Sequence, residues 1–440
     1  MQPTENNAQN TKNPLDGPIL LYGAGREAKS TRRFLKDIAP NTQVHVAVDN
    51  GPAELEDTLQ VPVDGLSAAF AANKYSMLVR SPGVSIYKNE IQTAIATGVK
   101  VTTNVNLWAR YKKNGAKTIA ITGTKGKSTT AKLVHTMLEA AGFDAALAGN
   151  IGVPVLDLAP HQYVVLELSS FQCADLRLDP DFIGITPIFP EHLDWHRTEQ
   201  QYFADKLNIL RRRRPYHCAL APQVIAHSSL PQPPSDLVHA LPELSCTFSQ
   251  RLSEQVATSR LKGKHNLENA ILAARLALGA GIDEQAVLDG IAVYLPLPHR
   301  LEEFHFSGKT FVDDSIATNP QATKAALATY DGKKLALIIG GFDRDQNFDD
   351  LSNHLMSCQL ASIWFLPGTG HRIASNFMDK DLPFKTHKIA SLKHIFEQLE
   401  ADPSQFEILL LSPGAPSFNQ FKNFEQRGEA FVELAKKHFG

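Results

Sequence analysis

The 440-residue chain is long enough for two to four domains, and its 43% hydrophobic and 20% charged residues are typical of a soluble globular protein. A formal net charge of −2 argues against a general nucleic-acid-binding protein, and no run of about 18 apolar residues is present to span a membrane. The four cysteines are scattered without a CxxC pair, which predicts a reducing, cytoplasmic setting and no zinc site. The first 16 residues are polar and lack the apolar core of a signal peptide, so we expect a disordered tail.

Residues 17–113 are predicted to form a first domain in which strands alternate with helices. Strands are expected at 18–21, 43–48, 75–80 and 99–102. Gly23-Ala24-Gly25-Arg26-Glu27 follows the first strand and Asp49 the second, which is half of a dinucleotide-binding pattern. A lone GxG is weak evidence, and Asp49 is equally well read as a plain strand-end acid.

Residues 117–138 have the order strand, glycine loop and helix that a phosphate-binding loop needs. The loop reads Gly123-Thr124-Lys125-Gly126-Lys127-Ser128-Thr129, in which Lys127 would reach the terminal phosphates and Ser128 would ligate Mg²⁺. The general motif has glycine where this chain has Ile121, so the loop follows a shorter form. The alternative is an ordinary glycine turn with a surface lysine.

Polar side chains follow the next strands of this central domain, predicted to span 114–299. Glu167 ends an apolar strand, where an acid commonly holds the Mg²⁺ of a nucleotide but can also be a satisfied core carboxylate. The cluster Glu191-His192-Leu193-Asp194-Trp195-His196 follows the strand 182–188 and could be either part of a site or surface polarity. Lys206 lies on a mostly apolar helix face, where snorkelling is the favoured interpretation from the residues alone.

Asn266 and Asn269 open a further helix and share one face because they are three residues apart. Amide side chains can pair with the edge of an adenine, although Asn266 could equally be a helix cap. Residues 300–440 are predicted to form a third domain with strands at 310–312, 334–339, 362–366 and 407–411, each followed by a polar or glycine-containing loop.

Eight ordered motifs resemble the Mur ligase family, the ATP-dependent amino-acid ligases of peptidoglycan synthesis. They are GTKGKST (123–129), GNIG (149–152), LELSSFQ (166–172), EHLDWH (191–196), KGKHNLENA (262–270), PHRLE (298–302), DDSIATNP (313–320) and LSPGAPSFNQFKNFEQRG (411–428). The resemblance implies an α/β protein of three domains. These are a Rossmann-like UDP-binding domain, a central P-loop ATPase-type domain with a mostly parallel sheet, and a C-terminal Rossmann-like domain that binds glutamate.

The resemblance also implies roles for individual residues. ATP would be bound by Gly123, Thr124, Lys125, Gly126, Lys127, Ser128, Thr129, Asn266, Asn269, Arg300 and Asp314. Two Mg²⁺ ions would be held by Ser128, Glu167, His192 and a carbamylated Lys206, which reverses the snorkelling interpretation; Lys127, His192 and Lys206 would be the catalytic residues. The UDP substrate would contact Gly23, Ala24, Gly25, Arg26, Asp49, Ser81, Pro82, Gly83 and Asn150, and the incoming glutamate Thr318, Arg344, Ser417 and Phe424.

The last motif is most similar to the branch that adds glutamate to UDP-N-acetylmuramoyl-L-alanine. Ile316 replaces a lysine that the D-glutamate-adding enzymes carry, and Phe342-Asp343-Arg344 replaces a glycine-lysine loop. These departures, together with Gly25-Arg26-Glu27, favour slightly the variant branch that adds L-glutamate and relies on a separate epimerase; D-glutamate stays open. We expect a monomer acting on small molecules. A folylpolyglutamate synthetase would lack the first domain, and a non-catalytic ATP-binding module would not need the metal and lysine positions.

Overall fold

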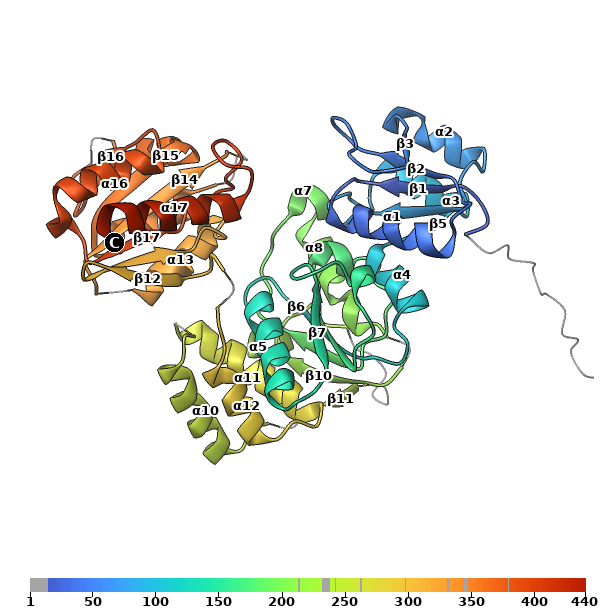
Figure 1. The fold of residues 1–440 in the computed structure, drawn as a ribbon, viewed down its shortest axis with the longest axis horizontal. Helices are drawn as coiled ribbons and strands as arrows, with labels where there is room; N and C mark the ends of the chain where they lie inside the picture. Colours follow the sequence, from blue (N-terminus) through green and yellow to red (C-terminus); the bar gives the residue numbers. More distant parts are fainter. Residues whose placement is uncertain are drawn as a thin grey trace, which may run out of the picture. The chain divides into compact units, whose positions relative to one another are not determined.

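The computed structural model describes residues 15–440 except residues 213, 232–237, 242, 262, 297, 331, 344–346 and 379 and the side chain of Gln321. It contains three β-sheets flanked by helices (Figure 1). Two compact units are present, one made of Met1–Thr258 with Leu267–Val293 and the other of Ser259–Asn266 with Tyr294–Gly440. In the described part of the chain no helix has the length and apolarity needed to cross a membrane.

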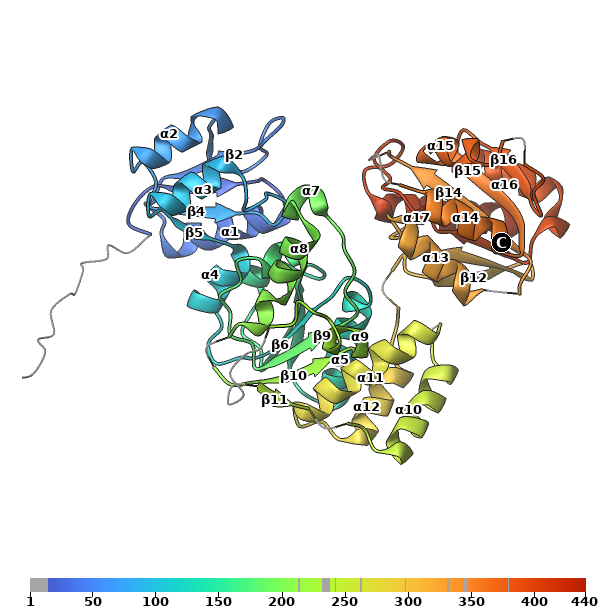
Figure 2. The same cartoon turned by 180° about the vertical axis from the view of Figure 1, so that it is seen from behind.

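The first sheet is parallel and has the strand order β3-β2-β1-β4-β5. Its strands are β1 (Ile19–Tyr22), β2 (Val44–Ala47), β3 (Leu59–Gln60), β4 (Met77–Arg80) and β5 (Lys100–Thr102). Successive strand side chains alternate between two cores, one under α1 (Arg26–Ile38) and α4 (Asn104–Tyr111) and one under α2 (Leu66–Ala71) and α3 (Asn89–Ala96). Figure 2 shows the α2 and α3 side.

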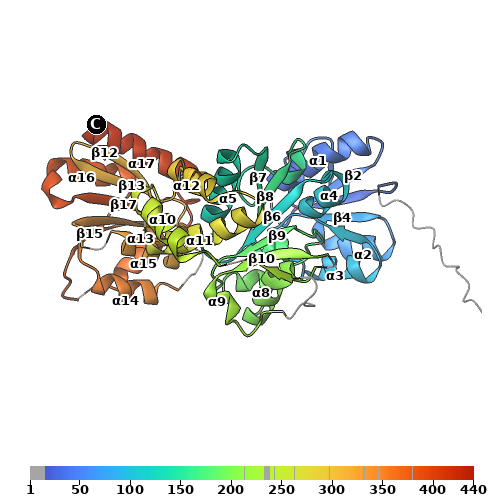
Figure 3. The same ribbon diagram turned by 90° about the horizontal axis from the view of Figure 1, so that it is seen from below.

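The central sheet is also parallel, with the strand order β11-β10-β9-β6-β8-β7 (Figure 3). Its strands are β6 (Lys117–Thr122), β7 (Ala145–Gly149), β8 (Tyr163–Glu167), β9 (Phe182–Ile185), β10 (Tyr216–Leu220) and β11 (Val238–Ala240). The helices of this region are α5 (Lys127–Ala140), α6 (Ser170–Cys173), α7 (Leu193–His196), α8 (Glu199–Lys206), α9 (Pro222–Ile225), α10 (Cys246–Thr258), α11 (Lys264–Gly279) and α12 (Glu284–Ala292).

One hydrophobic cluster joins the first and the central sheet. It runs from Phe34 on α1 through Trp108 on α4 to Leu156, Leu176 and Ile183 beside the central sheet. Because burial of apolar surface is the main favourable term in folding, this shared core accounts for both sheets belonging to one compact unit.

The second unit holds a mixed sheet with the order β12-β13-β17-β14-β15-β16, in which only the pairing of β12 with β13 is antiparallel among the described strands. The strands are β12 (Glu302–Phe306), β13 (Lys309–Asp313), β14 (Leu335–Gly341), β15 (Leu360–Gly368), β16 (Lys385–Lys388) and β17 (Ile408–Leu411). Helices α13 (Pro320–Thr329), α14 (Asp349–Ser357) and α15 (Thr369–Ser375) pack on one face, and α16 (Leu392–Ala401) and α17 (Phe424–Phe439) on the other.

The α/β class and the three sheets confirm the fold expected from the sequence. The domain boundaries at 17, 114 and 300 stay predictions. Residues 1–14 lie outside the described residues, so the expected disordered tail is not tested there. Leu15, which that tail included, is buried, and its carbonyl accepts a hydrogen bond from the Thr42 hydroxyl at 2.6 Å.

Candidate active site

Several loops meet at one edge of the central sheet. Strands β9, β6, β8 and β7 are neighbours and parallel, so their carboxyl ends lie side by side. The phosphate loop follows β6, residues 150–152 follow β7, Glu167 is the last residue of β8, and the segment that carries His192 follows β9. Parallel α/β sheets bind ligands at this edge, which makes it the candidate active site.

Close packing explains both glycines of the phosphate loop. Gly123 has φ +145°, and a Cβ there would lie 1.9 Å from the Thr186 hydroxyl oxygen. Gly126 has φ +85°, and a Cβ there would lie 2.1 Å from Asn269 Oδ1. Both positions need glycine for its positive φ and its lack of a side chain. Asn269 of α11 therefore lies against the loop, and its contact with adenine stays a prediction.

Other side chains of the loop are held by neighbouring loops. The Thr124 hydroxyl lies 2.6 Å from the Tyr202 hydroxyl and donates to the Phe189 carbonyl at 2.9 Å. Lys127 Nζ donates to the Thr124 carbonyl at 2.9 Å, at the start of α5. Lys125 Nζ lies 3.2 Å from Glu191 Oε1. Ser128 and Thr129 are buried in the first turn of α5, where backbone N–H groups and the helix dipole favour an anion.

Glu167 is a buried carboxylate at the end of β8. Its Oε1 accepts a hydrogen bond from Asn150 Nδ2 at 2.9 Å. Its Oε2 is buried and has no hydrogen-bond partner among the residues that the structure describes. A buried carboxylate oxygen without a partner is costly, so it is suited to receive a cation. Asn150, predicted to touch the substrate, thus positions Glu167 as well.

Lys206 is fully buried, so the snorkelling interpretation from the residues alone is wrong. Its Nζ donates to the Gly123 carbonyl at 2.6 Å. Burial, followed by the nearby charge of Lys127, lowers the pKa of Lys206 to about 7. A large fraction of this amine is therefore neutral near pH 7. Tyr202 and Asp205 of α8 are also buried, so Lys206 lies on the buried face of this helix.

His192 stands next to this lysine with a half-exposed ring. The residue has φ +56° and caps α7, and its ring lies 4.9 Å from that of Phe171. Partial desolvation, aided by the charges of Lys206 and Lys127, lowers the pKa of His192. The nearby Glu191 charge opposes this shift, and the net lowering favours the neutral ring, which is the form that ligates a metal.

Sequence reasoning missed a buried network beside Lys206. His196 Nδ1 lies 2.6 Å from Asp205 Oδ2, and His196 Nε2 lies 2.9 Å from the Ser170 hydroxyl. Tyr87, in the loop between β4 and α3, donates to Asp205 Oδ1 at 2.7 Å. The motif EHLDWH contained His196, but its partners lie on other elements. No spacing rule connects these residues.

The predicted UDP-binding loops lie at the carboxyl end of the first sheet. Gly23 has φ +104°, and a Cβ there would lie 2.5 Å from the Ser81 hydroxyl oxygen, so these two loops touch. Asp49 Oδ1 accepts from Tyr22 at 2.7 Å and from Lys88 at 2.6 Å. Burial opposes ionisation there, but these bonds outweigh it and the pKa of Asp49 is lowered. The carboxylate is thus ionised and already has partners.

Arg26 and Glu27, at the start of α1, reach the central domain. Arg26 donates from Nη1 to the Gly152 carbonyl at 3.3 Å and from Nη2 to the Asn150 carbonyl at 3.4 Å. Glu27 Oε1 accepts from Gln172 Nε2 at 2.7 Å, and burial raises the pKa of Glu27 to about 7. Arg26 was predicted to contact UDP; in this structure it contacts the loop that carries Asn150.

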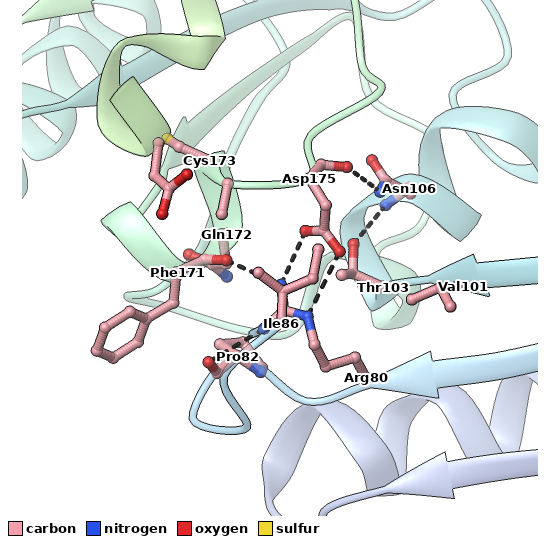
Figure 4. Close-up of polar contacts among 12 residues, drawn as sticks. Arg80, Pro82, Ile86, Val101, Thr103, Asn106, Phe171, Gln172, Cys173 and Asp175 are labelled. Carbon is pink, nitrogen blue, oxygen red and sulfur yellow. Dashed lines mark hydrogen bonds and ion pairs between the residues drawn. The ribbon is translucent and has the colours of Figure 1, made fainter. Parts of the chain in front are cut away.

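Arg80 connects the Ser81–Pro82–Gly83 loop to the central domain through hydrogen bonds and an ion pair (Figure 4). Its side chain is fully buried, and Nη2 donates to Asp175 Oδ1 at 2.8 Å and to the Phe171 carbonyl at 2.9 Å. Its Nη1 donates to the carbonyls of Pro82 at 3.2 Å and Val84 at 2.9 Å. The predicted substrate loop is therefore held to α6 by a charge-assisted set of bonds.

In the second unit the loops after β13, β17 and β14 are adjacent at one sheet edge. Asp314 is buried after β13, and Ser412 after β17 donates to its Oδ2 at 2.7 Å. Burial raises the pKa of Asp314 to about 7, although that bond and the Arg300 charge oppose the shift. Ser417 is buried, whereas Thr318 is partly exposed beside α13. Arg344 lies outside the described residues.

Arg427 organises this edge, and sequence reasoning did not single it out. The side chain is buried; its Nη2 donates to the Ser315 carbonyl at 2.8 Å and its Nη1 to the Ala415 carbonyl at 3.0 Å. The Ser315 hydroxyl in turn donates to the carbonyl of Phe424, the first residue of α17. The motif FKNFEQRG contained Arg427, but its partner Ser315 is 112 residues away.

Comparisons with known proteins identify the family of the chain. The Mur ligase middle-domain model matches residues 121–227. UDP-N-acetylmuramoyl-L-alanine–L-glutamate ligases of Micromonospora sp. and Xanthomonas oryzae pv. oryzae are each 33% identical, covering 96% and 95% of this chain and 97% and 94% of the relatives. The solved MurF ligase of Thermotoga maritima, in complex with ADP, is 13% identical with a TM-score of 0.57 over 97% of this chain and 99% of that one. The chain belongs to the Mur ligase family.

Proposed function

We propose that the protein is an ATP-dependent, ADP-forming ligase that adds L-glutamate to UDP-N-acetylmuramoyl-L-alanine for peptidoglycan synthesis. The observation that carries the proposal is that Glu167, His192 and Lys206 lie around a phosphate loop at one edge of the central sheet. The relatives that match this chain over almost its full length are named for this reaction. Those names support L-glutamate over the D isomer. A separate epimerase would then supply the D configuration elsewhere. Four free cysteines support a cytoplasmic location.

The side chains at the sheet edge fit a magnesium nucleotide. Glu167 offers a buried oxygen without a described partner, Ser128 offers a hydroxyl at the loop, and His192 offers a neutral ring. Oxygen-rich donors suit Mg²⁺. Bound Mg²⁺ would neutralise charge on the phosphate oxygens of ATP. Asn269 would face adenine, and on the family resemblance alone Asn266, Arg300 and Asp314 would also contact the nucleotide.

The chemistry activates a carboxylate before it meets an amine. The alanyl carboxylate of the substrate attacks the γ-phosphorus of ATP, and the bond from that phosphorus to the β-phosphate oxygen breaks. ADP departs, and the substrate now carries an acyl phosphate. The glutamate amine then attacks the carbonyl carbon, a tetrahedral intermediate forms, and inorganic phosphate departs as the amine loses a proton. Charge develops on oxygen in both steps, and the Lys127 ammonium would stabilise it.

Lys206 would act as a carbamate. Its amine is buried and substantially neutral near pH 7, so its nitrogen can attack the carbon of CO₂ and release a proton to water. The product is a fixed negative group beside Glu167 and the phosphate loop. The role is supported by burial and by the lowered pKa, which an exposed lysine would not have.

We infer the remaining substrate contacts from the family resemblance. The UDP part would bind at Gly23, Ala24, Gly25, Asp49, Ser81, Pro82 and Gly83, and the muramoyl part near Asn150. The incoming glutamate would bind at Thr318, Ser417 and Phe424, with Arg344 as the cation for a carboxylate. Arg344 is placed there on the family resemblance alone.

Phosphate release with UDP-N-acetylmuramoyl-L-alanine, ATP and Mg²⁺ tests the proposal, with L-glutamate, D-glutamate or no amino acid. We expect release with L-glutamate and at most a trace with D-glutamate. Release with D-glutamate alone would assign the D isomer, and no release with either would overturn the ligase proposal. Lys127→Ala should abolish turnover while the circular dichroism spectrum is unchanged, and Lys29→Ala, an exposed lysine on α1, should leave turnover at the wild-type level.

A further inference from the structure

A cavity of about 230 Å³ lies on the side of the first sheet that α4 covers. Its apolar lining includes Met77 of β4 and Leu107 of α4. Its charged lining is cationic, with Lys100 of β5, Arg110 of α4 and Arg177 of the segment after α6. Its neutral polar lining is made of Thr102, Asn106 and Tyr111. The cavity is therefore built jointly by the first domain and the central domain.

The three cations are not neutralised by acids. Across the described ranges, no carboxylate lies within ion-pair distance of Lys100, Arg110 or Arg177. Nearby Asp175 is paired with Arg80 at 2.8 Å, and Asp181 lies 3.4 Å from Lys113. Burial, with the like charges of Arg177 and Arg110, lowers the pKa of Lys100. Arg110 and Arg177 are exposed and Lys100 is half-buried, so three positive charges line one open pocket and are screened by solvent alone.

Hydrogen bonds hold the cationic wall in place. Arg177 Nη2 donates to the Val101 carbonyl at 3.1 Å, and the Arg177 backbone N–H donates to Asn106 Oδ1 at 2.7 Å. Asn106 Nδ2 donates to the Asp175 carbonyl at 2.8 Å, and the Asn106 N–H donates to the Thr103 hydroxyl that caps α4 (Figure 4). A wall fixed in this way loses little entropy when a ligand binds.

The cavity is separate from the predicted UDP site. The UDP loops follow the carboxyl ends of β1, β2 and β4. The cavity is instead lined by Met77 and Lys100, the first residues of β4 and β5. These two residues are partners in the parallel register, so the cavity lies at the amino ends of the two strands. An occupant here would sit away from the substrate loop. The lining residue Asn106 is bonded to the carbonyl of Asp175, whose carboxylate pairs with Arg80.

We propose that this cavity binds a small oxyanion with two negative charges, either inorganic phosphate or the phosphate of a small monoester. About 230 Å³ is the share of roughly seven or eight water molecules at about 30 Å³ each. That is enough for a phosphate and a few waters, and it is below the roughly 300 Å³ at which pockets for larger organic ligands begin. Guanidinium groups bind such oxyanions in bidentate fashion. This proposal does not depend on the ligase reaction.

Titration calorimetry with inorganic phosphate at constant ionic strength tests the site. The protein should carry Lys127→Ala, which weakens phosphate binding at the catalytic loop. We expect one saturable site to remain, and adding Lys100→Gln should weaken it by at least about tenfold, because one charged partner is lost. Arg177→Gln should act likewise. Lys100→Arg should keep most of the affinity, and the exposed-site variant Lys29→Gln should not change it.

Two results would overturn the proposal. One is the absence of saturable phosphate binding in the Lys127→Ala protein, and the other is equal affinity with and without Lys100→Gln. Melting temperatures of all variants show whether a loss of phosphate binding reflects a loss of the folded state. If Lys100→Gln does not fold, the affinity of Lys100→Arg still tests whether a positive charge at this position is needed. Competition by glycerol 2-phosphate distinguishes the two possible ligands. If it displaces bound inorganic phosphate, the site accepts a phosphate monoester; if it does not, the site is for free phosphate.

Discussion

His196 Nδ1 lies 2.6 Å from Asp205 Oδ2, and both side chains are buried beside the phosphate loop. The same carboxylate accepts a hydrogen bond from Tyr87 of the first domain, and Asp205 directly precedes Lys206 on α8. The pair therefore connects the loop between β4 and α3 to the helix that carries the proposed carbamate. We regard Asp205 as a positioning residue, because it acts on Lys206 through the helix and not on a substrate.

Asp205→Ala should lower both the melting temperature and kcat. It leaves His196 buried without its carboxylate, and a buried group that loses its partner costs about 1–3 kcal/mol. We expect kcat to fall by at least about tenfold while KM for ATP stays within about threefold. Steady-state kinetics with differential scanning fluorimetry check this. The matched variant Tyr87→Phe removes one donor only and should change kcat much less; wild-type kcat in Asp205→Ala would show that the pair has no positioning role.

The sequence predicts features that are local along the chain. The strand, loop and helix around Gly123 and Lys127 were found because their residues are contiguous and each element has its own periodicity. Arg80 and Asp175 could not be paired in advance, since 95 residues separate them and either could have been a surface charge. The residues around Lys206 favour snorkelling for the same reason. Its burial depends on packing of α8 against loops from distant strands.

Gly126→Ala should weaken nucleotide binding. A non-glycine residue at φ +85° costs roughly 1–2 kcal/mol, and the new Cβ would also displace the Asn269 side chain. We expect the Kd for ADP, measured by titration calorimetry, to rise at least about tenfold. Gly65→Ala is the control, because Gly65 has φ −90° and no atom lies near its missing Cβ. An unchanged Kd in Gly126→Ala would mean that Asn269 moves freely and does not shape the loop.

Glu167→Gln should raise the Mg²⁺ requirement of the reaction. The carboxylate has one oxygen bound to Asn150 and one without a described partner, so the amide removes the charge and keeps the shape. We expect the Mg²⁺ concentration for half-maximal phosphate release to rise by roughly tenfold or more, since a charged ligand is lost from a buried site. Glu254→Gln, an exposed acid on α10, should leave it unchanged. Equal Mg²⁺ curves would remove Glu167 from the metal site.

Asp314 should make the stability of the second unit depend on pH. Burial raises the pKa of its carboxyl from 3.8 to about 7, so the native state holds the proton more tightly than the unfolded state does. The stabilising contribution is therefore complete below about pH 4 and is lost as pH rises to about 7. Asp314→Asn has no such titration and can keep an oxygen for the Ser412 hydroxyl. The melting temperature of the variant should rise relative to wild type between pH 5 and pH 8, whereas that of Asp381→Asn, an exposed acid, should follow wild type. A constant difference between Asp314→Asn and wild type over this range would mean that Asp314 is ionised throughout it.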